Sequence, residues 1–88
     1  MLNYDLLPEH IRGSAKRYLE EGIMPGDFLQ AVICNDLLGA FLKADDTNVS
    51  NMLDIVKFFY NEAPTISWGS KEEMKKWIIL KRKEKEGK

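Results

Sequence analysis

The chain has 88 residues and a net charge of −1, and 44% of its residues are hydrophobic and 31% are charged. This length and composition indicate one globular domain with a modest core, which argues against a disordered chain and against a deep catalytic pocket. Residues 1–70 hold five basic and ten acidic residues, a net charge of −5, whereas residues 71–88 hold eight and four, a net charge of +4. An acidic body with a basic tail argues against nucleic-acid binding by the whole domain.

The first helix is predicted from Pro8 to Glu21, because proline is well tolerated in the first helical turn. Its apolar stripe at helical spacing consists of Ile11, Ala15, Tyr18 and Leu19. We expect Gly22 to end this helix in the left-handed conformation, with Ile23 folding back as an apolar contact.

A second helical segment is predicted after Met24-Pro25-Gly26, with Asp27 at its positive end. Its sequence FLQAVICNDLLGAF is apolar on nearly every side, which is typical of a central helix. Asn35 and Asp36 interrupt it. Asp36 is a good N-cap, so we favour two shorter helices joined at Asn35. The alternative is a continuous helix in which one of the two side chains lines a polar binding niche.

The third helix is predicted to start within residues 44–48, capped by Asp46 or Thr47, and to end before Pro64. Its expected apolar stripe consists of Val49, Leu53, Val56, Phe59 and Tyr60. Three aromatic residues follow one another at positions 58–60 and cannot all face one side, so we expect Phe58 to face outward or into a partner.

Ser70 and Glu73 fit the capping box at the start of the last helix. Met74, Trp77 and Ile78 should face inward, with Leu80 or the stem of Lys81 as further contacts, and residues 81–88 should fray as a basic tail. The predicted fold class is therefore all-α, a compact bundle of four to five short helices. Residues 1–88 form a single domain whose core is residues 8–80.

Catalytic and metal chemistry find little support in the sequence. A nucleophilic Cys34 would need a histidine beside it, and His10 lies on a different predicted helix. One cysteine and one histidine cannot build a zinc site. Asp46-x-Asn48-x-Ser50 begins like a calcium loop, but Asn51 and Lys57 occupy the two decisive positions. We expect no enzyme activity, catalytic residue, metal or cofactor.

Several stretches together resemble a family of small, largely uncharacterised proteins encoded by tailed phages and prophages. The resemblance covers roughly residues 7–78 and rests on LPEHIRGSAKRYLEEGIMPGDFLQAV, NDLLGAF, FFYNEAP, WGS and Trp77. It implies a viral accessory protein made inside a bacterial cell, but no particular ligand or catalytic residue.

The leading functional hypothesis is a non-enzymatic binding protein that blocks a host antiviral-defence factor, either a protein or a nucleoprotein complex. An acidic body suits a basic partner surface. Candidate binding residues near predicted helix ends, or with exposed aromatic rings, are Asn35, Asp36, Asp45, Asn48, Tyr60, Asn61, Trp68 and Ser70. Trp68 could instead plug the end of the bundle.

Two alternatives remain. In the first, an oligomer sequesters a small nucleotide, with asparagines and Ser70 reading the base or ribose and Tyr60 or Trp68 stacking on it. In the second, a structural or regulatory phage protein self-associates as a homodimer or higher oligomer, through its second helix and Phe58. Direct DNA binding is disfavoured because neither middle helix presents a basic or amide-rich face.

The location is expected to be the bacterial cytoplasm. MLNYDLLPEH does not resemble a signal peptide, and the apolar region 28–42 is too short and too interrupted to span a membrane. The single Cys34, among apolar neighbours, suits a buried free thiol in a reducing compartment.

Overall fold

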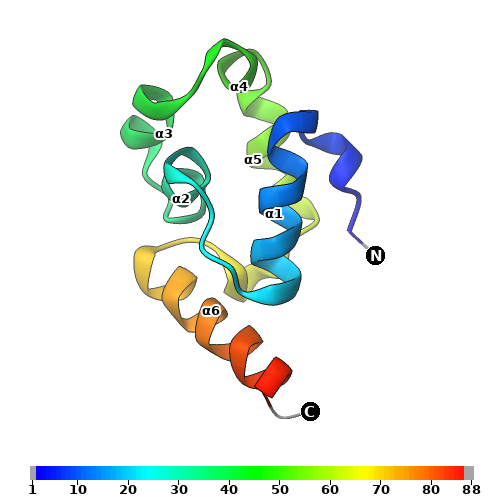
Figure 1. Cartoon of the computed structure of the whole chain (residues 1–88). Coiled ribbons are helices and arrows are strands. Elements are labelled where there is room, and N and C mark those ends of the chain that lie inside the picture. The colour runs from blue at the N-terminus through cyan, green and yellow to red at the C-terminus, as the bar shows by residue number, and fades with distance from the viewer. Residues whose placement is uncertain (1, 87–88) are drawn as a thin grey trace.

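The computed structural model describes residues 2–86. Within them the chain is all α-helical, with no strand, and confirms the predicted bundle (Figure 1). The helices are η1 (Tyr4–Leu6), α1 (Glu9–Glu21), α2 (Asp27–Ile33), α3 (Leu37–Lys43), α4 (Asp46–Ser50), α5 (Met52–Asn61), η2 (Thr65–Ser67) and α6 (Lys71–Glu86).

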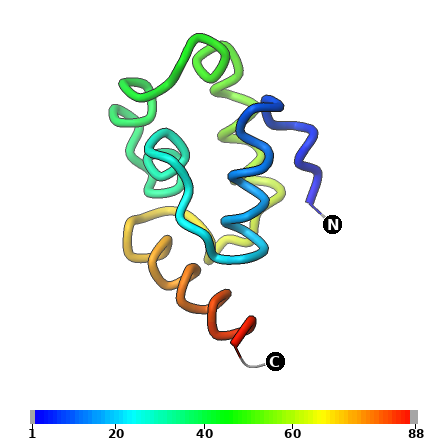
Figure 2. Tube along the Cα trace, viewed as in Figure 1, coloured from blue at the N-terminus to red at the C-terminus, as the bar shows by residue number. Residues whose placement is uncertain are grey.

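The described residues contain more α-helices than predicted because asparagines divide two of the predicted segments. Asn35 separates α2 from α3, as the favoured interpretation required, and Asn51 separates α4 from α5. The trace in Figure 2 shows α2 and α3 folding back on each other as a pair of short helices. In the same view α4 and α6 lie at opposite ends of a molecule measuring 40 × 24 × 20 Å.

The end of α1 follows the prediction. Gly22 has a φ of 70° and donates its N–H to the Tyr18 carbonyl at 3.0 Å, and the next N–H, of Ile23, reaches the Arg17 carbonyl at 3.3 Å. These bonds satisfy carbonyl groups that a helix end would otherwise leave unpaired. The Ile23 side chain itself is exposed, so the expected apolar contact by this residue is wrong.

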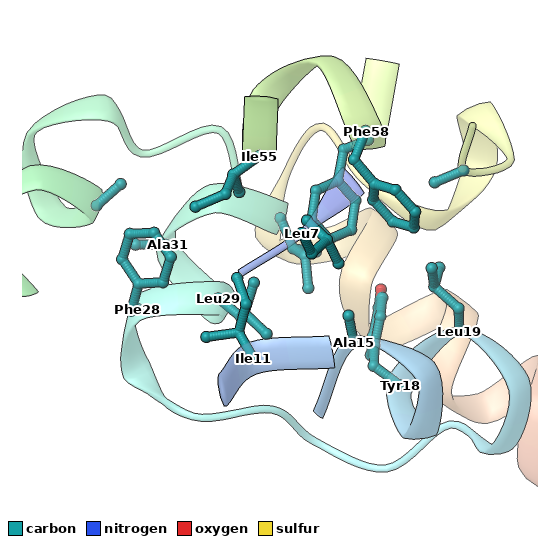
Figure 3. Packing of buried hydrophobic residues seen from close by; sticks show 14 of the residues in the cluster. Leu7, Ile11, Ala15, Tyr18, Leu19, Phe28, Leu29, Ala31, Ile55 and Phe58 are labelled. Atoms are coloured by element: carbon teal, nitrogen blue, oxygen red, sulfur yellow. The ribbon is translucent and has the colours of Figure 1, made fainter. Parts of the chain in front are cut away.

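The core gathers the inner faces of α1, α2, α5 and α6 (Figure 3). Tyr18 is fully buried at its centre, and its hydroxyl donates to the Ser67 carbonyl at 2.6 Å. The Tyr18 carbonyl in turn accepts from the Trp77 indole N–H at 3.2 Å. One residue of α1 thereby ties the helix to both η2 and α6.

The apolar stripe predicted for residues 49–60 is wrong except at Phe59, which is buried as expected. The buried side chains of α5 are Met52, Ile55, Phe58 and Phe59, whereas Val49, Leu53, Val56 and Tyr60 are exposed. Phe58, expected to face outward, is completely buried beneath Tyr4, with ring centroids 5.6 Å apart. Both stripes are apolar and both repeat at helical spacing, so periodicity alone could not choose between them.

The caps of the later helices also differ from expectation at one place. Asp45, not Asp46 or Thr47, caps α4, and its carboxylate accepts from the Asn48 N–H at 2.7 Å. Ser70 caps α6 as predicted, because its hydroxyl accepts from the Glu73 N–H at 3.1 Å.

Met74 and Trp77 of α6 are buried and Ile78 is half-buried, as predicted, while Leu80 is largely exposed. The helix continues to Glu86, so the expected fraying of residues 81–86 is wrong, and residues 87–88 lie outside the described residues. Lys85 reaches Glu21 of α1 at 2.9 Å and holds the pKa of that carboxyl below its usual range. The Lys81 ammonium lies 4.8 Å from the Trp77 ring centroid, where cation–π attraction helps to hold the last turns.

Candidate functional site

The joint between α2 and α3 is built by the two polar residues that interrupt the apolar segment. Asn35 has a φ of 61°, in the left-handed region that asparagine tolerates better than most residues. The Asp36 N–H reaches back to the Ala31 carbonyl at 2.8 Å, and the Asp36 carboxylate accepts from the Gly39 N–H at 3.0 Å. The pair therefore ends one helix and starts the next.

This turn opens onto an apolar groove between α3 and α5 with a cavity volume of about 140 Å³. The buried side chains of Ala40, Met52 and Phe59 line it together with the more exposed Leu37 and Val56. Its remaining lining residues are Ala31, Val32, Asn35, Asp36 and Trp68. The helix is interrupted at Asn35, as the favoured interpretation expected, so the alternative of a continuous helix is wrong. Asn35 and Asp36 do border a groove, but that groove is mainly apolar and is not a polar niche.

Trp68 closes the groove from the loop that follows η2. Its side chain is half-buried against the core, and its indole N–H is buried without a hydrogen-bond partner among residues 2–86. Tyr60 stands beside it with ring centroids 6.2 Å apart, and is itself 70% exposed. The Gly69 N–H donates to the Ile33 carbonyl at 2.7 Å, which fixes this loop against the end of α2.

Exposed apolar side chains extend outward from both walls of the groove. On α3, starting at Leu37, the helical rotation places Phe41, Leu38 and Leu42 in sequence on one continuous arc. On α5 the corresponding arc runs through Val56, Tyr60 and Leu53, and Val49 on the preceding α4 extends it along the chain. We call the two arcs the α3–α5 face, and it consists of Leu37, Leu38, Phe41, Leu42, Val49, Leu53, Val56 and Tyr60.

Each of these eight side chains is between 44% and 76% exposed. A fully buried aliphatic side chain is worth about 1.5–3 kcal/mol at about 25 cal/mol/Å², which implies roughly 100 Å² of apolar surface each. Because these side chains are on average roughly 60% exposed, the α3–α5 face exposes on the order of 500 Å², in the upper part of the roughly 300–600 Å² of the largest apolar patch on a typical monomer. The largest apolar patch of a monomer is often a functional surface.

The sequence-predicted binding residues divide into separate groups. Asn35, Asp36, Tyr60 and Trp68 meet at the groove and its edge. The remaining ones do not join them: Asn61 is exposed at the end of α5, and Ser70 is engaged in capping α6.

Asp45 and Asn48 line a different hollow, of about 300 Å³, between α1, the start of α2 and α4. Asp45 is paired there with His10, whose Nε2 lies 3.0 Å from the Asp45 carboxylate. The Asn48 side chain is buried, and its amide oxygen has no partner among the described residues. That oxygen is closed off from the hollow, since almost none of its surface is exposed.

The Cys34 thiol is half-buried and contacts the Met74 sulfur at 3.8 Å. Burial raises the pKa of this thiol above its ordinary value, which makes it a poor nucleophile at neutral pH. Within residues 2–86, no group of three or more histidine, cysteine or acidic side chains is placed to hold a metal ion.

Sequence reasoning missed the α3–α5 face, although one signal for it was present. Residues 37–42 are apolar around most of the helix, and so are residues 52–60. A chain this short cannot bury every side of two such helices. An excess of apolar surface was therefore predictable, but not which side would be left exposed.

No protein-family model, curated protein or solved structure matches the chain. Among the helices of the described residues, none is both long enough and apolar enough to cross a membrane.

Proposed function

We propose that this chain is a non-enzymatic binding protein of a phage or prophage, which acts by covering an apolar surface of a host protein with its α3–α5 face. The observation that carries the proposal is the set of eight large apolar side chains that α3, α4 and α5 leave exposed, together with the apolar groove that lies between α3 and α5. Fully buried aromatic and aliphatic anchors supply most of the binding energy in protein complexes. The face offers such anchors together with a groove to receive others.

The host-defence aspect of the proposal rests on the sequence resemblance. A small phage protein that binds by surface contact can inhibit a defence complex simply by occupying the site that the complex needs. The negative charge of residues 1–70 would favour approach to a basic partner.

The proposal is tested by affinity capture from a host-cell lysate with substitutions that spare the fold. Leu38 and Leu53 are each the second residue of a helix, are 71% and 66% exposed, and would tolerate aspartate because negative charge is favourable at a helix N-terminus. We expect the L38D/L53D double variant to lose the captured protein. The matched control is Ile79→Asp, which places the same charge on an exposed α6 position outside the face.

Host proteins captured equally by the wild type and by L38D/L53D would refute the proposal. The host-defence aspect has its own readout, which is phage plating on defended cells that express each variant. Wild type and I79D should raise plating, and L38D/L53D should not.

The nucleotide-sequestering alternative has weaker support. The asparagines and the serine expected to read a base or ribose lie apart, since Asn48 is buried on α4, Asn61 is at the far end of α5 and Ser70 caps α6. The groove is apolar and small for a nucleotide, because ligand pockets typically measure about 300–1,000 Å³. Calorimetric titration with cyclic nucleotides separates the two ideas, and tight binding of any of them would favour the alternative.

A further inference from the structure

We propose that a second copy of this chain covers the α3–α5 face in the free protein, forming a two-fold symmetric dimer in which a leucine of each α3 fills the groove of the other copy. This inference rests on the proposed function, because it concerns the same face. In the absence of a host protein, the α3–α5 face would be covered by the second copy.

A standard protein–protein interface buries about 800 Å² on each partner, of which a little over half is apolar, and the α3–α5 face offers on the order of 500 Å² of apolar surface. The molecule exposes 5729 Å² in all, so this face is about a tenth of its surface, the share that a standard interface takes on a small protein. Association of two copies removes this surface at once, without requiring any other component.

A two-fold interface needs a surface whose protruding and hollow parts lie on the same patch, so that each copy supplies both. Leu38 and Leu42 are the most exposed side chains of α3, at 71% and 76%, and they lie on the arc next to the groove. The groove volume of about 140 Å³ is close to that of an engineered cavity of about 150 Å³, made by truncating one leucine, which remains dry and apolar. One leucine side chain therefore suits it in size and polarity.

The edges of the face carry charges of both signs: Asp36 lines the groove, Asp46 precedes Val49 by three residues, and Lys57 follows Leu53 by four. Two copies related by a two-fold axis can therefore meet with opposite charges near each other. A rim of one sign would oppose self-association through like-charge repulsion.

The dimer has a consequence for the proposed function. Because the same face would contact the host protein, that protein must displace one copy, and binding becomes dependent on the concentration of the free monomer.

The test is sedimentation equilibrium of the full chain at protein concentrations from roughly 1 to 100 µM, the range in which typical associations are resolved. We expect the wild type and I79D to approach twice the chain mass of 10.2 kDa. L38D/L53D should remain at 10.2 kDa. Two interface anchors lost from each copy should weaken association at least about 30-fold.

A second measurement locates the interface. In the Trp77→Phe variant the only tryptophan is Trp68, at the groove. Its emission should move to longer wavelengths on dilution, over the same concentration range as the mass change, because dissociation lets water into the groove. Circular dichroism verifies that each variant keeps its helical content.

Three results would overturn the dimer: a monomeric wild type at the highest concentration, association that persists in L38D/L53D, or a Trp68 emission that does not follow dissociation. A monomeric wild type whose L38D/L53D variant still loses host capture would refute this inference and leave the proposed function standing. Retained host capture by L38D/L53D would refute the proposed function whatever the oligomeric state.

Discussion

Replacing Tyr18 with phenylalanine removes one hydroxyl group from the centre of the protein and keeps the aromatic ring. That hydroxyl donates to the Ser67 carbonyl at 2.6 Å, and both residues are completely buried. The ring packs against the core as before, so the substitution isolates the hydrogen bond between α1 and η2.

The expected loss of stability comes from leaving the buried Ser67 carbonyl without the Tyr18 hydroxyl as its donor. An unsatisfied buried polar group costs about 1–3 kcal/mol, whereas an exposed hydrogen bond exchanged for water costs far less. For a domain of 60–100 residues each kcal/mol lowers the Tm by about 4–8 °C. A loss of about 2 kcal/mol in the free energy of unfolding, the middle of this range, should therefore lower the Tm of the Tyr18→Phe variant by roughly 10 °C.

The assays are thermal denaturation, which gives the Tm, and urea denaturation, which gives the free energy of unfolding. Both are followed by circular dichroism at a single protein concentration, because self-association would add to the apparent stability. The matched control is Tyr60→Phe, which removes the same atom from a side chain that is 70% exposed and should change stability by less than about 0.5 kcal/mol. Equal losses of stability in Tyr18→Phe and Tyr60→Phe would refute the prediction, since burial would then not determine how much the tyrosine hydroxyl contributes to stability.

Three further predictions concern a close approach, a cap and pH. Gly22→Ala should destabilise the fold by about 2 kcal/mol or more in urea denaturation, because the backbone φ is 70° and the new Cβ would lie 2.9 Å from the Ile78 carbonyl oxygen. The control is Gly26→Ala, which has open space around the new Cβ and should be neutral or stabilising. Replacing glycine by alanine inside a helix usually stabilises a protein by about 1 kcal/mol, but Gly39→Ala should not, because the new Cβ would overlap the Asp36 carboxylate. In an Asp36→Ala background the same substitution should be stabilising again. Urea denaturation of the two single variants and the double variant tests this, and additive effects would contradict the prediction. Burial raises the pKa values of the Cys34 thiol and the Tyr18 hydroxyl in the folded state. The free energy of unfolding should therefore decline as pH rises, because the unfolded chain loses these protons first. The contribution of each group to stability is complete below its unfolded pKa, about 8.5 for cysteine and about 10 for tyrosine, and is lost above it. Denaturation between pH 7 and 11 checks this, and Cys34→Ala should remove the earlier part of the decline.

The helix boundaries were largely predictable because short-range forces set them. Gly22 ends α1 through its own left-handed backbone, Asp36 caps α3 by accepting from the N–H three residues later, and Ser70 caps α6 in the same way. Each of these bonds joins residues that are neighbours in the chain. The misplaced cap at α4 shows the limit of this reasoning: several of the residues at 45–48 could cap the helix, and Asp45 does so.

The candidate site was only partly predictable. Asn35, Asp36 and Trp68 were predicted as binding residues from the sequence, and the structure brings them together at one groove. Their meeting depends on the loop after η2 returning to the end of α2, where the Gly69 N–H bonds to the Ile33 carbonyl across 36 residues. No local pattern encodes a contact of that separation.

The sequence by itself determined that this chain is helical, where most of its helices start and stop, and that it holds more apolar surface than so small a domain can bury. Only the tertiary structure decided which side of α5 faces the core. Met52, Ile55 and Phe58 on one side, and Leu53, Val56 and Tyr60 on the other, satisfy the same helical period. The choice between them depends on the free energy of packing against Leu7, Tyr18 and Leu29, residues remote in sequence, and the side not chosen became the exposed face.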